Sequence, residues 1–250
     1  MCGRFAMYSE SARIARRFEA EDLKTGSDTE SVESLGAPQP SWNVAPSQLV
    51  FTVTGSSGHR ELEICRWGLV PPWAKDLSIG SRMINARSER VSSSPAFHHA
   101  FQRQRCIIPI NGFYEWQKTS EGLGSGPHPG RQRKQPYYMS LPDNDLLALA
   151  GIWEIWTDPQ DPQGNQVRTC SILTRESSGI MLPIHDRMPL ILNPVNWDCW
   201  LAPEPLSALE QEDLLSSLPP PIVATPVSTA VNSPRNNGPE LIRDFSKGIE

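Results

Sequence analysis

Cys2 is the residue of this chain whose position carries the most chemistry. A side chain as small as cysteine at position 2 permits removal of the initiator methionine, which leaves a free α-amine beside the thiol. Such an amine has a pKa of about 7.7–8.0, so a useful fraction is neutral near pH 7 and can condense with an aldehyde. The thiol can then close onto the imine to give a thiazolidine. An accidental cysteine near the terminus is the alternative.

Glu115 lies in the segment GFYEW. If this segment is extended, Phe113 and Glu115 share one face, while Tyr114 and Trp116 share the other. Burial among aromatic residues raises the pKa of a carboxyl group and suits it to general acid–base work. A buried ion pair with one of the arginines is the alternative for this residue.

His185 lies in LPIHDRMPL, where Pro183 and Pro189 restrict the backbone on both sides. A histidine that titrates near neutral pH in a rigid polar loop can transfer protons. A purely structural histidine explains the same pattern.

MINARSER at 83–90 places Asn85 and Arg87 on one side of an extended segment. An amide can orient a reacting hydroxyl or carbonyl group, and an arginine binds phosphate through its planar guanidinium. Trp73 and Trp116 offer aromatic faces on which bases can stack. Three further arginines can extend a groove that follows a nucleic-acid backbone: Arg4, Arg82 and Arg90.

The net charge of −5 does not exclude nucleic acid, because the charge is unevenly distributed. Residues 19–33 carry six acids against one lysine, whereas 60–110 carry eight basic residues against four acids. A local basic surface can attract phosphates on an acidic protein. Scattered, solvated arginines are the alternative.

Cysteine usage and hydropathy favour an intracellular protein. The five cysteines are odd in number, widely spaced and without a CxxC pair, which argues against a disulfide framework and a structural zinc. No apolar run approaches the roughly 18–20 residues that span a membrane, and no secretory signal is visible. We therefore expect no metal, no cofactor and no membrane association.

The elements that must position these residues are mostly strands. We predict one α+β domain with a mainly antiparallel, barrel-like sheet core flanked by short helices. Flexible loops are expected at 19–40 and 118–135, a further insertion at 158–165 and a loose tail from about 234. Strands are predicted at 49–54, 62–67, 105–110, 136–141, 146–153 and 169–174, and helices at 9–18 (capped by Ser9 or Ser11), 95–103 (Pro95 first) and 206–217.

The order of motifs resembles that of the SOS response-associated peptidase (SRAP) family. The resemblance rests on MCGRF at the N-terminus, WNVAPSQ at 42–48, RWGLVPPWAKD at 66–76, INARSE at 84–89, RCIIPINGFYEW at 105–116, TRES at 174–177 and IHDRMPLIL at 184–192. It spans 2–232, so we expect one catalytic and DNA-binding domain over 1–232 and a tail over 233–250. No expected catalytic position departs from the family pattern.

The resemblance implies recognition of abasic sites in single-stranded DNA, including single-strand/double-strand junctions, by a monomer. It also implies a thiazolidine cross-link between the ring-opened sugar and the N-terminal cysteine, which protects the lesion during replication and the DNA-damage response. A self-processing peptidase or lyase-type activity is implied as a secondary function, since only Met1 precedes Cys2.

The resemblance also implies a role for each site residue. Cys2 is the nucleophile, and its own α-amine forms the initial Schiff base. His185 assists opening of the sugar ring, and Glu115 is the acid–base group in imine formation and reversal. Asn85 positions the cysteine amine or the sugar. The implied DNA contacts are Arg4 and Arg87 to phosphates, and Pro46 and Trp116 to the pocket or to neighbouring bases.

Two other classes of function remain as alternatives. An N-terminal-nucleophile hydrolase, such as a glutamine amidotransferase, also begins Met-Cys-Gly and uses the α-amine as a base, but the chain is short for such a domain. A non-covalent single-strand DNA-binding module would keep its affinity after Cys2→Ala. Glutaminase activity that requires Cys2 would favour the first.

Overall fold

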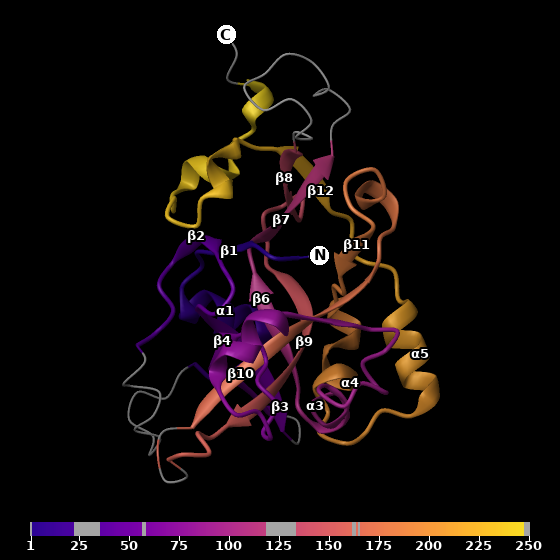
Figure 1. Cartoon of the computed structure of the whole chain (residues 1–250). Coiled ribbons are helices and arrows are strands. Elements are labelled where there is room, and N and C mark those ends of the chain that lie inside the picture. Colours follow the sequence, from indigo (N-terminus) through magenta and orange to yellow (C-terminus); the bar gives the residue numbers. More distant parts are fainter. Residues whose placement is uncertain are drawn as a thin grey trace.

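A computed structural model describes residues 2–22, 36–56, 59–118, 134–161, 164 and 166–247. Over these residues, twelve strands form two sheets (Figure 1). The larger sheet closes into a ring, because its last strand pairs with β10 again. The predicted α+β fold with a barrel-like sheet is confirmed. In ring order the strands are β10 (Val167–Glu176), β4 (His59–Trp67), β3 (Leu49–Ser56), β6 (Arg105–Ile110) and β9 (Leu147–Trp156).

Two short strands attach to β10 outside the ring and carry site residues. β5 (Asn85–Arg87) pairs with β10 in parallel, and β11 (Arg187–Pro189) pairs with it antiparallel. Over the described residues every strand pairing is antiparallel except those of β4 and β5 with β10. The mainly antiparallel character predicted from the sequence is therefore correct.

The smaller sheet lies above the barrel in the view of Figure 1, next to the C-terminal segments drawn in yellow. The chain crosses from barrel to smaller sheet at Asn111, between β6 and β7. The Asn111 side chain accepts from the backbone N–H groups of Tyr8 and Ser9 at 2.8 and 3.1 Å. The smaller sheet has the order β12 (Val223–Pro226), β8 (Lys134–Ser140), β7 (Gly112–Lys118), β1 (Phe5–Met7) and β2 (Ser41–Val44).

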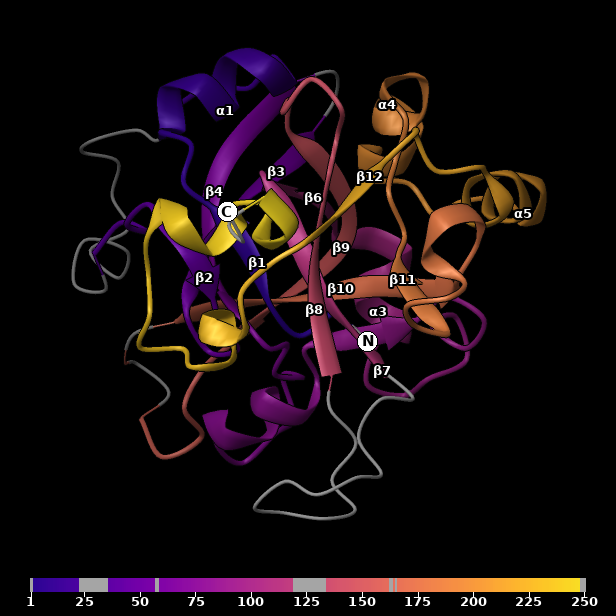
Figure 2. The same cartoon turned by 90° about the horizontal axis from the view of Figure 1, so that it is seen from above.

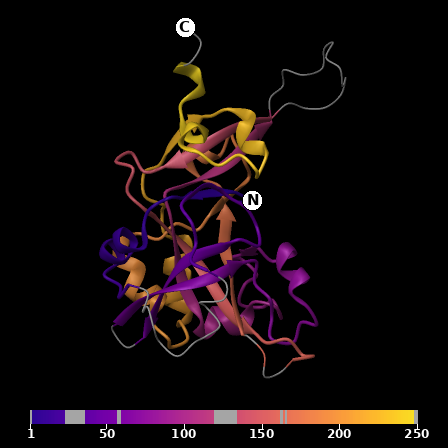
Figure 3. The same ribbon diagram turned by 90° about the vertical axis from the view of Figure 1, so that its left-hand side faces the viewer.

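β1 crosses the molecule between the barrel and the C-terminal segments (Figure 3). Each side of it contributes to a separate apolar cluster. Phe5 is buried in the barrel core, whereas Ala6 packs with Tyr114 and Leu241 in a second cluster. This alternation follows from the two-residue period of a strand. The residue that precedes β1 by three positions, Cys2, is thereby brought into the barrel core.

The helices lie at the periphery, with α1 on one side and α4 and α5 on the other (Figure 2). The predicted helix at 9–18 forms as α1 (Ser11–Phe18), but neither Ser9 nor Ser11 caps it: Glu10 occupies the cap position without a side-chain cap bond. The helix predicted at 95–103 is shorter, because α3 (His98–Arg103) begins three residues after Pro95. The remaining α-helices of the described residues are α4 (Trp197–Leu201) and α5 (Ala208–Ser216), the latter capped by Ser207 and Glu210.

The predicted loose tail is wrong for residues 234–247. Leu241 is buried against the smaller sheet, and the Asn237 side-chain Oδ1 accepts from the Trp42 backbone N–H at 2.7 Å. The glycine and proline of this segment, Gly238 and Pro239, therefore begin a 3₁₀ turn that packs against the smaller sheet, and do not indicate a free end. The loops predicted at 19–40 and 118–135 lie mostly outside the described residues.

A close approach of two backbone segments, at Gly68 and Gly80, positions the chain that leads into β5. Gly68, at φ +125°, lies against Gly80, where an added Cβ would come within 2.5 Å of the Gly80 carbonyl oxygen. Only glycine combines this conformation with this contact. The Leu69 N–H then donates to Met83 O at 3.1 Å, so the segment that ends in Asn85 follows β4 closely.

Candidate functional site

Cys2 and Asn85 are joined by a direct hydrogen bond. The Asn85 side-chain Nδ2 donates to the Cys2 carbonyl oxygen at 2.8 Å, across 83 positions of sequence. Asn85 holds this place because β5 pairs with β10, with Asn85 opposite Ile172. The Cys2 side chain is fully buried, and burial raises the pKa of its thiol above the ordinary value, with the charge of Glu115 acting in the same direction. The thiol therefore stays neutral at physiological pH.

Glu115 is a buried carboxyl on β7. Its side chain is 2% exposed, and this burial raises the pKa of the group, opposed by the nearby charge of His185. The neighbouring side chains alternate as predicted, because Phe113 lies in the barrel core and Tyr114 in the second cluster. A carboxyl that keeps its proton to a higher pH can act as an acid in a site near neutrality.

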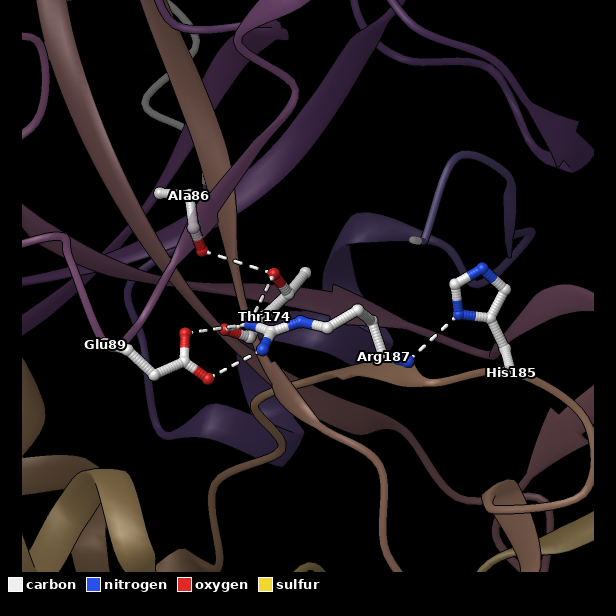
Figure 4. Close-up of polar contacts among 5 residues, drawn as sticks. All are labelled: Ala86, Glu89, Thr174, His185 and Arg187. Atoms are coloured by element: carbon white, nitrogen blue, oxygen red, sulfur yellow. Dashed lines mark hydrogen bonds and ion pairs between the residues drawn. The ribbon is translucent and has the colours of Figure 1, made fainter.

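His185, in the loop before β11, faces Glu115 on β7. Its Nε2 lies 4.0 Å from Glu115 Oε2. Its Nδ1 accepts from the Arg187 backbone N–H at 2.9 Å (Figure 4). The same Nδ1 lies 2.8 Å from Asp186 Oδ1. Thus one hydrogen bond joins Cys2 to Asn85, His185 lies 4.0 Å from Glu115, and the charge of Glu115 acts on the Cys2 thiol.

The sequence interpretation missed an ion pair between Glu89 and Arg187. Arg187 Nη1 and Nη2 donate to the two carboxylate oxygens of Glu89 at 2.6 and 3.0 Å, and Nη2 also donates to Thr174 O at 2.6 Å (Figure 4). Donation from Arg187 holds the pKa of Glu89 below its usual value. Both residues lie inside motifs that the sequence marks, INARSE and IHDRMPLIL, but their partnership depends on β10 pairing with β5 and β11 at once.

A pocket of about 410 Å³ opens beside Asn85. Arg87 and Arg90 are exposed in its wall, and over the described residues neither guanidinium has a hydrogen-bonded or ion-paired carboxylate. Exposed arginines of this kind attract phosphate. Phe97 adds an apolar surface. The pocket is lined by Asn85, Arg87, Arg90, Ser93, Ser94 and Phe97.

Arg4 is engaged within the protein. Its Nη1 donates to Asn43 Oδ1 at 2.8 Å and to Val231 O at 3.1 Å, and burial lowers the pKa of its guanidinium. Asn43, which the sequence interpretation did not single out, is buried and donates to three carbonyl oxygens of the C-terminal segment: Val231, Ser233 and Asn236. These contacts give Arg4 a structural role.

The three remaining predicted DNA contacts lie at separate positions. Trp73 is 63% exposed in the turn after β4. Pro46 is half-buried in the turn between β2 and β3, and Trp116 is half-buried on β7, where its Nε1 donates to Asn232 Oδ1 at 2.7 Å. Trp73 therefore offers the more open of the two aromatic surfaces.

One group of side chains among the described residues has donor atoms close enough to hold a metal ion. Glu21, His59 and Glu61 bring their ligand atoms within 4.8 Å of one another, and His59 Nε2 lies 3.0 Å from Glu21 Oε1. None of these is a predicted site residue. All five cysteines are free thiols, and in the described part of the chain no helix is long and apolar enough to cross a membrane.

Comparison with known proteins identifies relatives over the full chain. Residues 1–234 match the model of the family described as SOS response associated peptidase (SRAP). The abasic site processing protein YoqW of Bacillus subtilis (strain 168) is 39% identical over 247 residues, covering 97% of this chain and 99% of the relative. The abasic site processing protein HMCES of Gallus gallus is 29% identical, covering 100% of this chain and 79% of the relative.

The fold also matches a solved structure. A crystal structure from Bacteroides thetaiotaomicron has a TM-score of 0.76 and 24% identity, covering 97% of this chain and 99% of that chain. At this identity the match supports the fold alone. It agrees with the closed ring of strands described above.

Proposed function

The chain belongs to the SOS response-associated peptidase (SRAP) family, and from this premise we propose that it recognises abasic sites in single-stranded DNA and binds them covalently through Cys2. The observation that carries the proposal is the convergence of Cys2, Asn85, Glu115 and His185 from four separate parts of the chain. The names of the relatives, abasic site processing proteins, supply the class of lesion.

The bond-forming steps need an aldehyde, an amine and a thiol. Removal of Met1 frees the Cys2 α-amine, which adds to the aldehyde of the ring-opened sugar and loses water to give an imine. The Cys2 S–H then adds across the C=N bond, so sulfur bonds to carbon and nitrogen keeps a proton. The product is a thiazolidine, and the whole sequence releases one water.

The site residues act on the protons of these steps. Burial keeps the Cys2 thiol neutral, so its addition needs a proton acceptor, and the Glu115 carboxyl in its ionised form is the group whose charge acts on this thiol. His185, 4.0 Å from Glu115, transfers protons during opening of the sugar ring. Asn85 holds the Cys2 carbonyl and thereby orients the amine.

DNA contacts are proposed at two kinds of surface. Arg87 and Arg90 bind phosphates at the pocket beside Asn85, and Arg4 contributes a further positive charge. Trp73, with Pro46 and Trp116, contacts bases on either side of the lesion. We propose that single-strand/double-strand junctions are bound as well, and that the protein acts as an intracellular monomer in the SOS response. A peptidase or lyase-type activity is confined to removal of Met1 and to reversal of the cross-link.

A denaturing gel tests the proposal. Untagged protein is incubated with a uracil-containing single strand that uracil glycosylase has converted to an abasic strand. We expect a band of lower mobility that disappears in Cys2→Ser and persists in Cys199→Ser, a control at another free thiol. A band that persists in Cys2→Ser contradicts the proposed nucleophile. Glutaminase activity lost in Cys2→Ser would instead favour a hydrolase.

A further inference from the structure

Arg187 connects the backbone beside His185 to a carboxylate on a distant segment. Its guanidinium lies between Glu89, which follows β5, and Thr174 on β10 (Figure 4). Thr174 Oγ1 in turn donates to Ala86 O at 3.4 Å, so the contacts join β5, β10 and β11. Arg187 is only 9% exposed, and a buried guanidinium in a two-pronged contact has little freedom to move.

The other end of Arg187 contacts His185. The Arg187 backbone N–H donates to His185 Nδ1 at 2.9 Å. A neutral imidazole has one protonated and one unprotonated nitrogen, so a nitrogen that accepts here leaves the proton on the other. The other nitrogen is Nε2, which lies 4.0 Å from Glu115 Oε2. The position of the Arg187 backbone N–H therefore determines that the protonated nitrogen of neutral His185 is Nε2, the one that faces Glu115.

Asp186 competes for the same nitrogen. Its Oδ1 lies 2.8 Å from Nδ1, an arrangement that is favourable only when Nδ1 carries a proton. The Asp186 side chain is 86% exposed, so water replaces this contact at small cost. The N–H of the buried Arg187, by contrast, would lose its acceptor, and a buried unsatisfied donor is costly. The backbone contact therefore decides the tautomer of the neutral ring.

We propose that Glu89, acting through Arg187, is a positioning residue that holds neutral His185 with its proton on Nε2, facing Glu115. Its consequence for reaction rate rests on the proposed cross-linking function; the tautomer itself does not. Glu89→Gln keeps the shape of the side chain but turns an amide N–H₂ toward the guanidinium, so one of the two donated bonds is lost. Glu89→Asp keeps the carboxylate. Glu176→Gln is the matched control, because Glu176 pairs with Arg187 in the β10–β11 ladder and is exposed.

The direct test is the ¹⁵N spectrum of the His185 ring in DNA-free protein at a pH where the imidazole is neutral. Signals are assigned by their loss in His185→Ala. We expect Nδ1 to have the shift of an unprotonated acceptor in the wild type, in Glu89→Asp and in Glu176→Gln, and a mixture of both tautomers in Glu89→Gln. A protonated Nδ1 in the wild type, or an unchanged spectrum in Glu89→Gln, overturns the proposal.

The rate of cross-linking gives the second readout. Outer partners that orient a metal-bound histidine change activity by about 10- to 100-fold when removed, and we expect a fall in this range for Glu89→Gln. The dissociation constant for the initial non-covalent complex should not change, and Glu89→Asp should restore most of the rate. A changed tautomer with an unchanged rate also overturns the proposal. Absence of any cross-link in the wild type would count against the proposed function alone, because the spectrum is recorded without DNA.

Discussion

His185 Nε2 lies 4.0 Å from Oε2 of Glu115, a carboxyl that burial keeps protonated to a higher pH than usual. The two residues are 70 positions apart in the chain and come from β7 and from the loop before β11. An acid and a base held this close can exchange a proton with a substrate placed between them or beside them. This pair is the part of the site on which the predicted pH and rate effects depend.

Glu115→Gln should slow cross-linking to abasic single strands. The amide cannot exchange protons, and general acid–base groups contribute roughly 10²–10⁴-fold, so we expect a fall of about 10²–10³-fold. The rate is measured by quenched time points on a denaturing gel, with non-covalent binding measured separately. A variant as fast as the wild type would leave Glu115 with a structural role only.

Glu115 should also make stability depend on pH. In the unfolded chain it ionises at about 4.3, while in the folded protein its raised pKa keeps the proton to a higher pH. Between these two pKa values the unfolded state releases the proton first, so the free energy of unfolding falls as pH rises.

Urea unfolding of Glu115→Gln and the wild type at a series of pH values measures this effect. Relative to the wild type, the free energy of unfolding of Glu115→Gln should increase as pH rises from about 4. Glu176→Gln, at an exposed carboxylate of β10, is the control. A difference between wild type and Glu115→Gln that stays constant across the range would show that Glu115 has no raised pKa.

Arg87→Gln and Arg90→Gln should each weaken binding to single strands and flatten its salt dependence. Each phosphate contact on a single strand contributes about 0.7 to the slope of log K against log salt concentration. Arg16→Gln, at an exposed arginine of α1, should leave the slope unchanged. If the two pocket variants keep the wild-type slope, their guanidinium groups do not contact phosphates.

Asn43→Ala should destabilise the fold. It removes a buried amide that accepts from Arg4 and donates to the C-terminal segment, and leaves these partners without their bonds. We expect a loss of about 2–3 kcal/mol in the free energy of unfolding. Gln48→Ala removes a single exposed contact to Ala45 and should cost under about 1 kcal/mol. An equal loss of unfolding free energy in the two variants would contradict the proposal that Asn43 stabilises the contact between Arg4 and the C-terminal segment.

The strongest strands were predictable from the sequence, and the shortest were not. RCIIPI at 105–110 is a continuous apolar run and forms β6 with the predicted bounds, because it is buried on both faces. β5 and β11 have three residues each and no period of their own. They exist because β10 offers backbone partners, and this pairing between distant segments leaves no local pattern.

The candidate site was predictable where residue type suggested chemistry. Cys2, Asn85, Glu115 and His185 were each singled out from the sequence for this reason. Glu89 and Asn43 were not, because an acid after a strand and an amide within one are common on any surface. Their importance arises from burial and from partners 98 and up to 193 positions away. The C-terminal segment was misjudged for the same reason, since its contacts lie on β2.

Intact mass of the cross-linked product, with and without borohydride, tests the central claim most directly. An imine and a thiazolidine have the same mass, namely protein lacking Met1 plus DNA minus one water, but only the imine gains two hydrogens on reduction. We expect that mass for untagged protein, unchanged by borohydride, and no product when extra residues precede Cys2. A product that borohydride reduces quantitatively, or one that forms on N-terminally extended protein, would contradict a thiazolidine at Cys2.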